Sequence, residues 1–255
     1  PTPGTREGGR MDGIIRQPVS GLTGGSMYGL SDLGYTMVYG VLLLLNFAHV
    51  DLVMVGSYVA RAVLLMAGIT GGMALAALGG VLLALFLVSG FASSFLGVLI
   101  ERVAYKPLRE STRLAPMISA LGVSLVLENG AMLVAGRAPR VFPGGIFPVQ
   151  SYSVFGATFS NLQIFIVVVS ALLMFGLYWL VNRTIFGLQI RAVAENRNTA
   201  SLMGVNVDRT ISLVFIVGPA LGAAAGVLFS LYYGVAFFTM GFTAGLKAFT
   251  AAVLG

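Results

Sequence analysis

Long apolar runs separated by short polar connections make up most of the chain. Three stretches carry no Asp, Glu, Lys or Arg: those between Arg61 and Glu101, between Arg140 and Arg183, and between Arg209 and Lys247. Each stretch exceeds the roughly 20 apolar residues with which a helix crosses a bilayer. Because the runs are continuous, as in LVFIVGPALGAAAGVLFSLYYGV, they predict membrane-spanning helices and not barrel strands.

The pattern predicts an all-α fold, a polytopic transmembrane bundle of about six to eight membrane segments. A further segment begins at residue 236. The other expected segments are residues 19–46, 52–67, 73–100, 115–135, 161–181 and 210–233.

Composition supports a membrane protein and excludes an ordinary soluble domain. The chain is 57% hydrophobic and 9% charged, with a mean hydropathy of +0.94. Absence of cysteine excludes a disulfide framework and thiolate chemistry. No catalytic or nucleotide-binding motif occurs, so we expect no enzyme activity, no bound cofactor or metal, and ATP hydrolysis, if needed, on another polypeptide.

The net charge of +6 is a topology signal and not a nucleic-acid footprint. Eight of the fifteen basic residues lie in two short loops, Arg102, Lys106, Arg109 and Arg113 in one, and Arg183, Arg191, Arg197 and Arg209 in the other. The positive-inside rule places both loops, residues 101–113 and 183–209, in the cytoplasm. We therefore expect a polar leader over residues 1–16 and a membrane domain over residues 17–255.

The sequence gives two opposing signals for the side of the membrane on which the N-terminus lies. Arg6, Arg10 and Arg16 favour a cytoplasmic start, whereas three crossings before Glu101 place it outside. A break within residues 19–46, giving four crossings or a re-entrant piece, would reconcile the two signals.

Glycines recur every four residues in three places. Such rows let helix backbones approach closely in lipid, so they predict tight helix packing. The rows are Gly21, Gly25 and Gly29, then Gly218, Gly222 and Gly226, and then Gly241 with Gly245.

A few ionisable residues interrupt the apolar runs and are functional candidates, because an ionisable side chain is costly at membrane depth. They are Asp32, His49, Asp51, Arg61, Glu128 and Lys247. In NFAHVD, two alternatives stay open: an interface turn with a capping Asp51, or a helix break that lines a translocation path with Asn46 and His49. Glu128 faces that path or lies near the outer interface.

The second basic loop is a candidate docking element. Strong helix formers predict one helix from Arg191 to Met203, Gly204 stops it, and Asn206 or Asp208 caps the next span. Such a helix packs on a partner or is a solvated linker.

Several long blocks resemble the permease subunits of branched-chain amino-acid ABC importers of the LivH type, in the BPD-transport type 2 family. They are LGYTMVYG, NFAHVDLVMVGSYV, ERVAYKPLR, RLAPMISALGVSLVLEN, RAVAENRNTASLMGVNVDR and LYYGVAFFTMGFTAGLKAFTAAVLG. The likeness covers residues 21–255.

The resemblance implies a multi-pass permease in the bacterial cytoplasmic membrane that moves leucine, isoleucine or valine. It implies a LivM-like sister permease, two cytoplasmic ATPase subunits and an extracytoplasmic substrate-binding protein as partners, besides membrane lipid. The alternatives are an ion-coupled carrier or channel for a small polar solute, and urea or a short amide as cargo.

The resemblance also points to an E-A-A-x-x-x-G signature that docks the ATPase. Ala200 and Gly204 match its third and last positions, whereas Asn198 and Thr199 replace Glu and Ala; Glu195 precedes them. Val50 stands where the family usually has Gly after NFAH. Because family members continue further, we expect that the chain is truncated at Gly255. Since the first residue is not Met and Met11 can be the natural start, we also expect a non-native leader before Met11.

Overall fold

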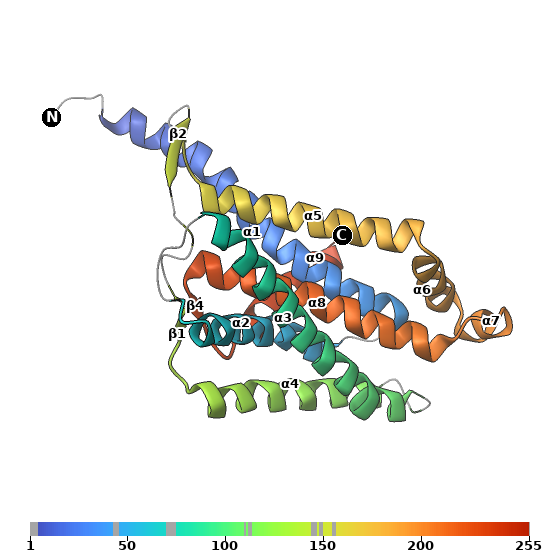
Figure 1. Ribbon diagram of the computed structural model, residues 1–255. Coiled ribbons are helices and arrows are strands. Elements are labelled where there is room, and N and C mark those ends of the chain that lie inside the picture. Colours follow the sequence, from blue (N-terminus) through green and yellow to red (C-terminus); the bar gives the residue numbers. More distant parts are fainter. Residues whose placement is uncertain are drawn as a thin grey trace.

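The computed structural model describes residues 5–42, 46–69, 75–109, 111, 114–143, 147, 150–154 and 157–254. Figure 1 shows an elongated bundle of helices. Within the described residues the α-helices are α1 (Thr5–Leu42), α2 (Phe47–Met66), α3 (Leu75–Ile100), α4 (Leu114–Ala135), α5 (Asn161–Arg183), α6 (Ile185–Glu195), α7 (Arg197–Leu202), α8 (Val207–Tyr233) and α9 (Met240–Leu254).

The all-α prediction is confirmed, and five helices in the described part of the chain are long and apolar enough to cross a membrane. They are α2, α3 with its short continuation, α4, α5 and α8. The continuation is a π-helical turn, η1 (Glu101–Tyr105), and a 3₁₀ turn, η2 (Lys106–Leu108). Helix α1 is richer in Gly, Ser and Thr, yet it crosses the same bundle beside α8.

Helix α8 is the centre of the bundle and packs against α1, α2 and α3. The cluster around Phe215, Val214 and Ile211 joins α8 to the cytoplasmic halves of α1 and α2. In contrast, α4 and α5 bury little of their apolar surface within the chain. The exposed apolar faces of α4 and α5 are therefore suited to contact with lipid or with another subunit.

The glycine prediction holds for α8 and α9 but only in part for α1. A Cβ on Gly222 would lie 3.6 Å from Val53 Cγ2, and one on Gly226 would meet the Val53 backbone oxygen. Gly241 and Gly245 likewise abut Val50 of α2. These close approaches let α2 lie between α8 and α9.

Two glycines of the first row face no neighbour in the described structure. A Cβ on Gly21 or Gly25 would meet nothing within 4 Å, whereas one on Gly29 would lie 3.0 Å from Met174 Cε of α5. The row is therefore not one packing stripe among the described residues.

Four short strands lie at one end of the bundle, opposite α6 and α7 (Figure 1). Strands β2 (Ser151–Val154) and β3 (Ala157–Ser160) form a hairpin, and β1 (Arg140–Val141) pairs antiparallel with β4 (Val235–Ala236). The Arg61 guanidinium of α2 donates to the Val141 carbonyl at 3.0 Å and fixes this end.

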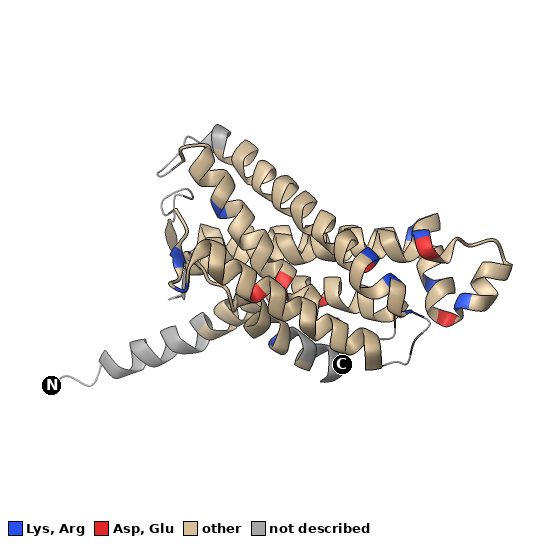
Figure 2. Cartoon of the chain, turned by 90° about the horizontal axis from the view of Figure 1, so that it is seen from below, with Lys and Arg blue, Asp and Glu red and all other residues tan. Residues whose placement is uncertain are grey.

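The chain crosses the bundle once through α1, once through α2 and once through α3 before reaching Glu101. Helix α1 is continuous to Leu42, so no break within its described length adds a crossing. Figure 2 shows most Lys and Arg residues at the two ends of the bundle, whereas acidic residues lie both in its middle and at the end that carries α6 and α7. The end with α6 and α7 carries both basic loops, which makes it the cytoplasmic end and the strand-bearing end the outer one.

Candidate functional site

The second basic loop forms two short helices and not the single helix that its composition predicts. Asn196 lies between α6 and α7 with an extended backbone, φ −157° and ψ 111°. Its side-chain oxygen accepts a hydrogen bond from the Thr199 amide at 3.0 Å, which caps α7. The prediction of one continuous helix is therefore wrong, because an Asn that can cap the next turn competes with helix continuation.

The predicted stop at Gly204 is confirmed. Gly204 has φ +83°, a left-handed conformation that glycine adopts without steric cost. After it, the Asn206 side chain caps α8 by accepting from the Arg209 amide at 2.9 Å. The loop is thus held at both ends by local hydrogen bonds.

Helix α7 has one buried face and one exposed face. Ala200 is buried beside Val41, Val193 and Ile211 in the cytoplasmic core cluster. The side chains of Glu195, Asn198 and Thr199 are exposed. A small residue at position 200 lets α7 lie close to the bundle while its polar face points away from it.

Two exposed apolar residues complete this surface and were not among the predicted site residues. Leu202 is 88% exposed and Met203 is 81% exposed at the end of α7. The loop protrudes from the cytoplasmic end of the bundle (Figure 1). An apolar tip outside the membrane-spanning region is suited to insertion into a partner protein. We call Asn198, Thr199, Leu202 and Met203 the coupling face.

Arg197 connects this loop to the cytoplasmic end of α1. Its Nη2 donates to the carbonyl oxygens of Val41 at 2.9 Å and Leu42 at 3.1 Å. These carbonyls belong to the last turn of α1 and lack partners within the helix. Burial, and secondarily the charge of Arg109, lower the pKa of Arg197, but a guanidinium stays protonated at neutral pH.

A network of charged side chains joins the first basic loop to α8. Buried Glu101 accepts hydrogen bonds from Arg109 and, at 3.1 Å, from the Ser212 hydroxyl. Arg109 also forms a salt bridge with Asp208, and Lys106 forms a second one with Asp208 at 3.2 Å. All of these side chains except Arg109 also line a groove of about 570 Å³ between the first basic loop and the start of α8. The network therefore holds the first basic loop against α8, next to the second basic loop.

The helix break in NFAHVD is present, but its cap is Asn46 and not Asp51. Asn46 Oδ1 accepts from the His49 amide at 3.2 Å and from the Tyr105 hydroxyl at 2.5 Å. The predicted capping role of Asp51 is wrong, because Asp51 lies beyond the first turn of α2. Asn46 thus accepts hydrogen bonds from one amide and one hydroxyl group.

His49 packs in the core between α1 and α8. It is 1% exposed, and a Cβ on Gly34 or Gly218 would lie 3.0 or 3.4 Å from its ring. Among the described residues neither ring nitrogen has a hydrogen-bond partner. His49 therefore fills the space that two glycines leave at a helix crossing, and its role in a translocation path stays a prediction.

Asp51 and Glu128 lie at the contact of α2 with α4. Buried Asp51 accepts a hydrogen bond from the Ser124 hydroxyl of α4, and Glu128 follows Ser124 by four residues on the same face. Beyond them a groove of about 730 Å³ runs between α2, α3 and α4. The four path candidates therefore form two groups on different faces of α2, Asn46 with His49 and Asp51 with Glu128.

Comparison with known proteins identifies relatives along nearly the whole chain. A family model described as the branched-chain amino acid transport system / permease component matches residues 17–255. The chain is 43% identical over 244 residues to the high-affinity branched-chain amino acid transport system permease protein BraD of Pseudomonas aeruginosa, which covers 94% of this chain and 78% of that protein.

Two further relatives carry a similar name. The chain is 42% identical over 248 residues to the permease protein LivH of Escherichia coli K12, covering 95% of this chain and 79% of that protein. It is 32% identical over 205 residues to the probable permease LivH of Methanocaldococcus jannaschii, covering 77% of this chain and 60% of that protein. No solved structure matches the chain.

The family match and the membrane-spanning helices agree with the resemblance seen in the sequence. The expected location, a multi-pass protein of the bacterial cytoplasmic membrane, is confirmed. The chain belongs to the permease component family of branched-chain amino acid transport systems.

Proposed function

We propose that the chain is one half of the membrane channel of an ATP-binding-cassette importer for leucine, isoleucine and valine. The observation that carries this proposal is the coupling face. A short helix outside the membrane presents polar residues and an exposed apolar tip, while Ala200 and Gly204 anchor and end it at the signature positions. A carrier that works alone has no use for such a surface.

The partners follow from this assignment. Two cytoplasmic ATPase subunits hydrolyse ATP, and this chain binds one of them through the coupling face. A LivM-like sister permease covers apolar surface that the chain leaves exposed on its long helices, and a substrate-binding protein delivers the amino acid to the outer end. The chain itself binds no cofactor in this scheme.

The cargo assignment is supported by relatives named as branched-chain amino acid permeases at 42–43% identity over most of the chain. Urea or a short amide is a less favoured cargo, because no feature of the described structure points to it. The ion-coupled carrier is less favoured as well, since Asp51 is already hydrogen-bonded to Ser124 in a packed helix contact.

Reconstituted uptake tests the proposal. The chain, its sister permease, the ATPases and the binding protein are placed in liposomes, and labelled leucine is followed with ATP inside. We expect uptake that stops when ATP, the binding protein or the ATPases are omitted. Uptake by this chain alone, driven by an ion gradient, would establish the carrier instead. ATP hydrolysis stimulated by the binding protein without leucine uptake would refute the cargo.

A further inference from the structure

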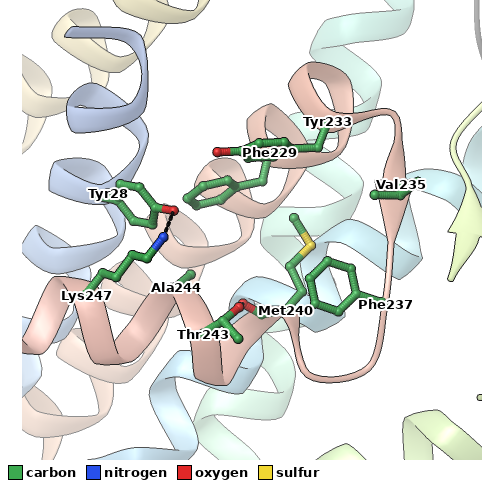
Figure 3. A pocket seen from close by; sticks show the side chains of 9 residues that line it. All are labelled: Tyr28, Phe229, Tyr233, Val235, Phe237, Met240, Thr243, Ala244 and Lys247. Atoms are coloured by element: carbon green, nitrogen blue, oxygen red, sulfur yellow. Dashed lines mark hydrogen bonds between the residues drawn. The ribbon is translucent and has the colours of Figure 1, made fainter. Parts of the chain in front are cut away.

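A small pocket near the outer end of the bundle combines one lysine with aromatic side chains. Its volume is about 340 Å³, at the lower end of the roughly 300–1,000 Å³ of small-molecule sites. Figure 3 shows nine lining residues that come from α1, α8, α9 and the connection through β4. They are Tyr28, Phe229, Tyr233, Val235, Phe237, Met240, Thr243, Ala244 and Lys247.

The Lys247 ammonium is incompletely paired. Its Nζ donates to the Tyr28 hydroxyl at 3.1 Å and lies 5.1 Å from the centre of the Tyr28 ring (Figure 3). An ammonium has three N–H donors, and among the described residues the Tyr28 hydroxyl is the one acceptor of Lys247. None of the nine lining residues is acidic, and within the described chain no carboxylate forms a salt bridge with Lys247.

The Lys247 side chain is exposed on the surface of the described bundle, where a ligand can reach it. Helix α9 is otherwise apolar around position 247, and the pocket begins about one helical turn inside the outer end of α8, at Phe229. A cation at such depth is costly unless it is paired or hydrated. A carboxylate that enters the pocket from the outer side would form a charge-assisted hydrogen bond with this ammonium.

The other walls fit the remaining groups of an aliphatic amino acid. Phe237 and Met240 offer apolar contact for a branched side chain. The rings of Phe229 and Tyr233 lie nearly parallel, 6.0 Å apart and 12° between planes, and such ring faces attract an ammonium group. The Gly234 carbonyl is held by the Phe142 amide at 2.9 Å, so the wall after α8 is anchored to the α4–α5 connection.

We propose that this pocket is a transient binding site for the substrate within the permease, with Lys247 holding the carboxylate of an aliphatic amino acid. The proposal rests on the proposed function and adds a recognition step inside the membrane, after release from the binding protein. Tyr28 positions the lysine. An acidic side chain on the substrate would find no second basic group among the lining residues, so such amino acids fit poorly.

Uptake by the complete reconstituted importer with saturating binding protein tests the role of the charge. Lys247→Gln should lower the maximal uptake rate about tenfold, because a hydrogen bond from a charged donor to a carboxylate is roughly twice as strong as one from a neutral amide. Lys247→Arg should stay within about threefold of the wild type. The control is Leu246→Gln, which adds the same amide one residue away, on a side that faces Tyr35 and Phe242 instead of this pocket.

Two readouts separate substrate binding from a structural role. Binding-protein-stimulated ATP hydrolysis and the yield of assembled complex should be unchanged in Lys247→Gln. A photoreactive diazirine analogue of leucine should label wild-type peptides that contain Phe229 or Met240, excess leucine should prevent this, and Lys247→Gln should abolish it.

The proposal is overturned if Lys247→Gln imports at the wild-type rate, or if Leu246→Gln is equally impaired. Loss of assembled complex in both Lys247 variants would likewise overturn it, because the lysine would then serve assembly. Failure of the wild-type importer to take up leucine would instead refute the proposed function, so the two failures are distinguishable.

Discussion

Replacing Arg197 by methionine should separate ATP hydrolysis from transport. The guanidinium donates to two carbonyls of the last turn of α1, at 2.9 and 3.1 Å, and so ties the coupling loop to a membrane helix. Hydrogen bonds from a charged group contribute roughly 1.5–3 kcal/mol. Because Arg197 is only half-buried, we take about 2 kcal/mol for the pair, which corresponds to about 30-fold in an equilibrium constant.

The assay measures leucine imported per ATP hydrolysed in proteoliposomes. We expect Arg197→Met to reduce this ratio about 10- to 30-fold while ATP hydrolysis continues. The control is Arg191→Met, because Arg191 lies in the same loop but, among the described residues, reaches only the exposed Asn182 side chain, at 3.4 Å. If Arg197→Met imports as much leucine per ATP as the wild type, the contact between Arg197 and the end of α1 does not couple ATP hydrolysis in the ATPase to transport.

Three further substitutions test other parts of the account. Gly204→Leu forces a branched residue to φ +83° at a cost of about 1–2 kcal/mol, so uptake should be uncoupled from ATP hydrolysis with normal membrane insertion; normal transport would contradict the docking assignment. Glu101→Gln leaves Arg109 with one fewer buried partner and should lower the stability of the purified complex by about 3 kcal/mol in thermal unfolding; an unchanged midpoint would contradict a structural role for the network. Gly226→Leu should reduce the amount of folded protein in the membrane, because its Cβ meets the α2 backbone, whereas Gly25→Leu should not; equal yields would contradict the packing.

The membrane helices could be predicted closely from the sequence because their lengths are set by the bilayer. The expected segments 115–135 and 210–233 correspond to α4 and α8 within a few residues at either end. The pairing of β1 with β4 could not be predicted, because each strand has two residues and the partners are far apart in sequence. The single crossing of α1 was left open, since its Gly and Ser content weakens the apolar pattern.

The candidate site was predicted where local chemistry decides the structure. Gly204 and Asn206 were identified because a helix stop and a helix cap depend on one residue each. The break at Asn196 was missed, since a residue surrounded by helix formers looks like a helix interior. The acceptors of Arg197 were also missed, because they lie about 155 residues earlier and only the fold brings them together.

Disulfide cross-linking shows whether the coupling face touches the ATPase. The chain has no cysteine, so Asn198→Cys places a single thiol on the coupling face. With a cysteine on the membrane-facing surface of the ATPase, we predict a cross-link from position 198. The control Tyr152→Cys, in exposed β2 at the outer end, should give none. An assembled complex that forms no cross-link from Asn198→Cys, for any cysteine position scanned across that ATPase surface, would contradict the account.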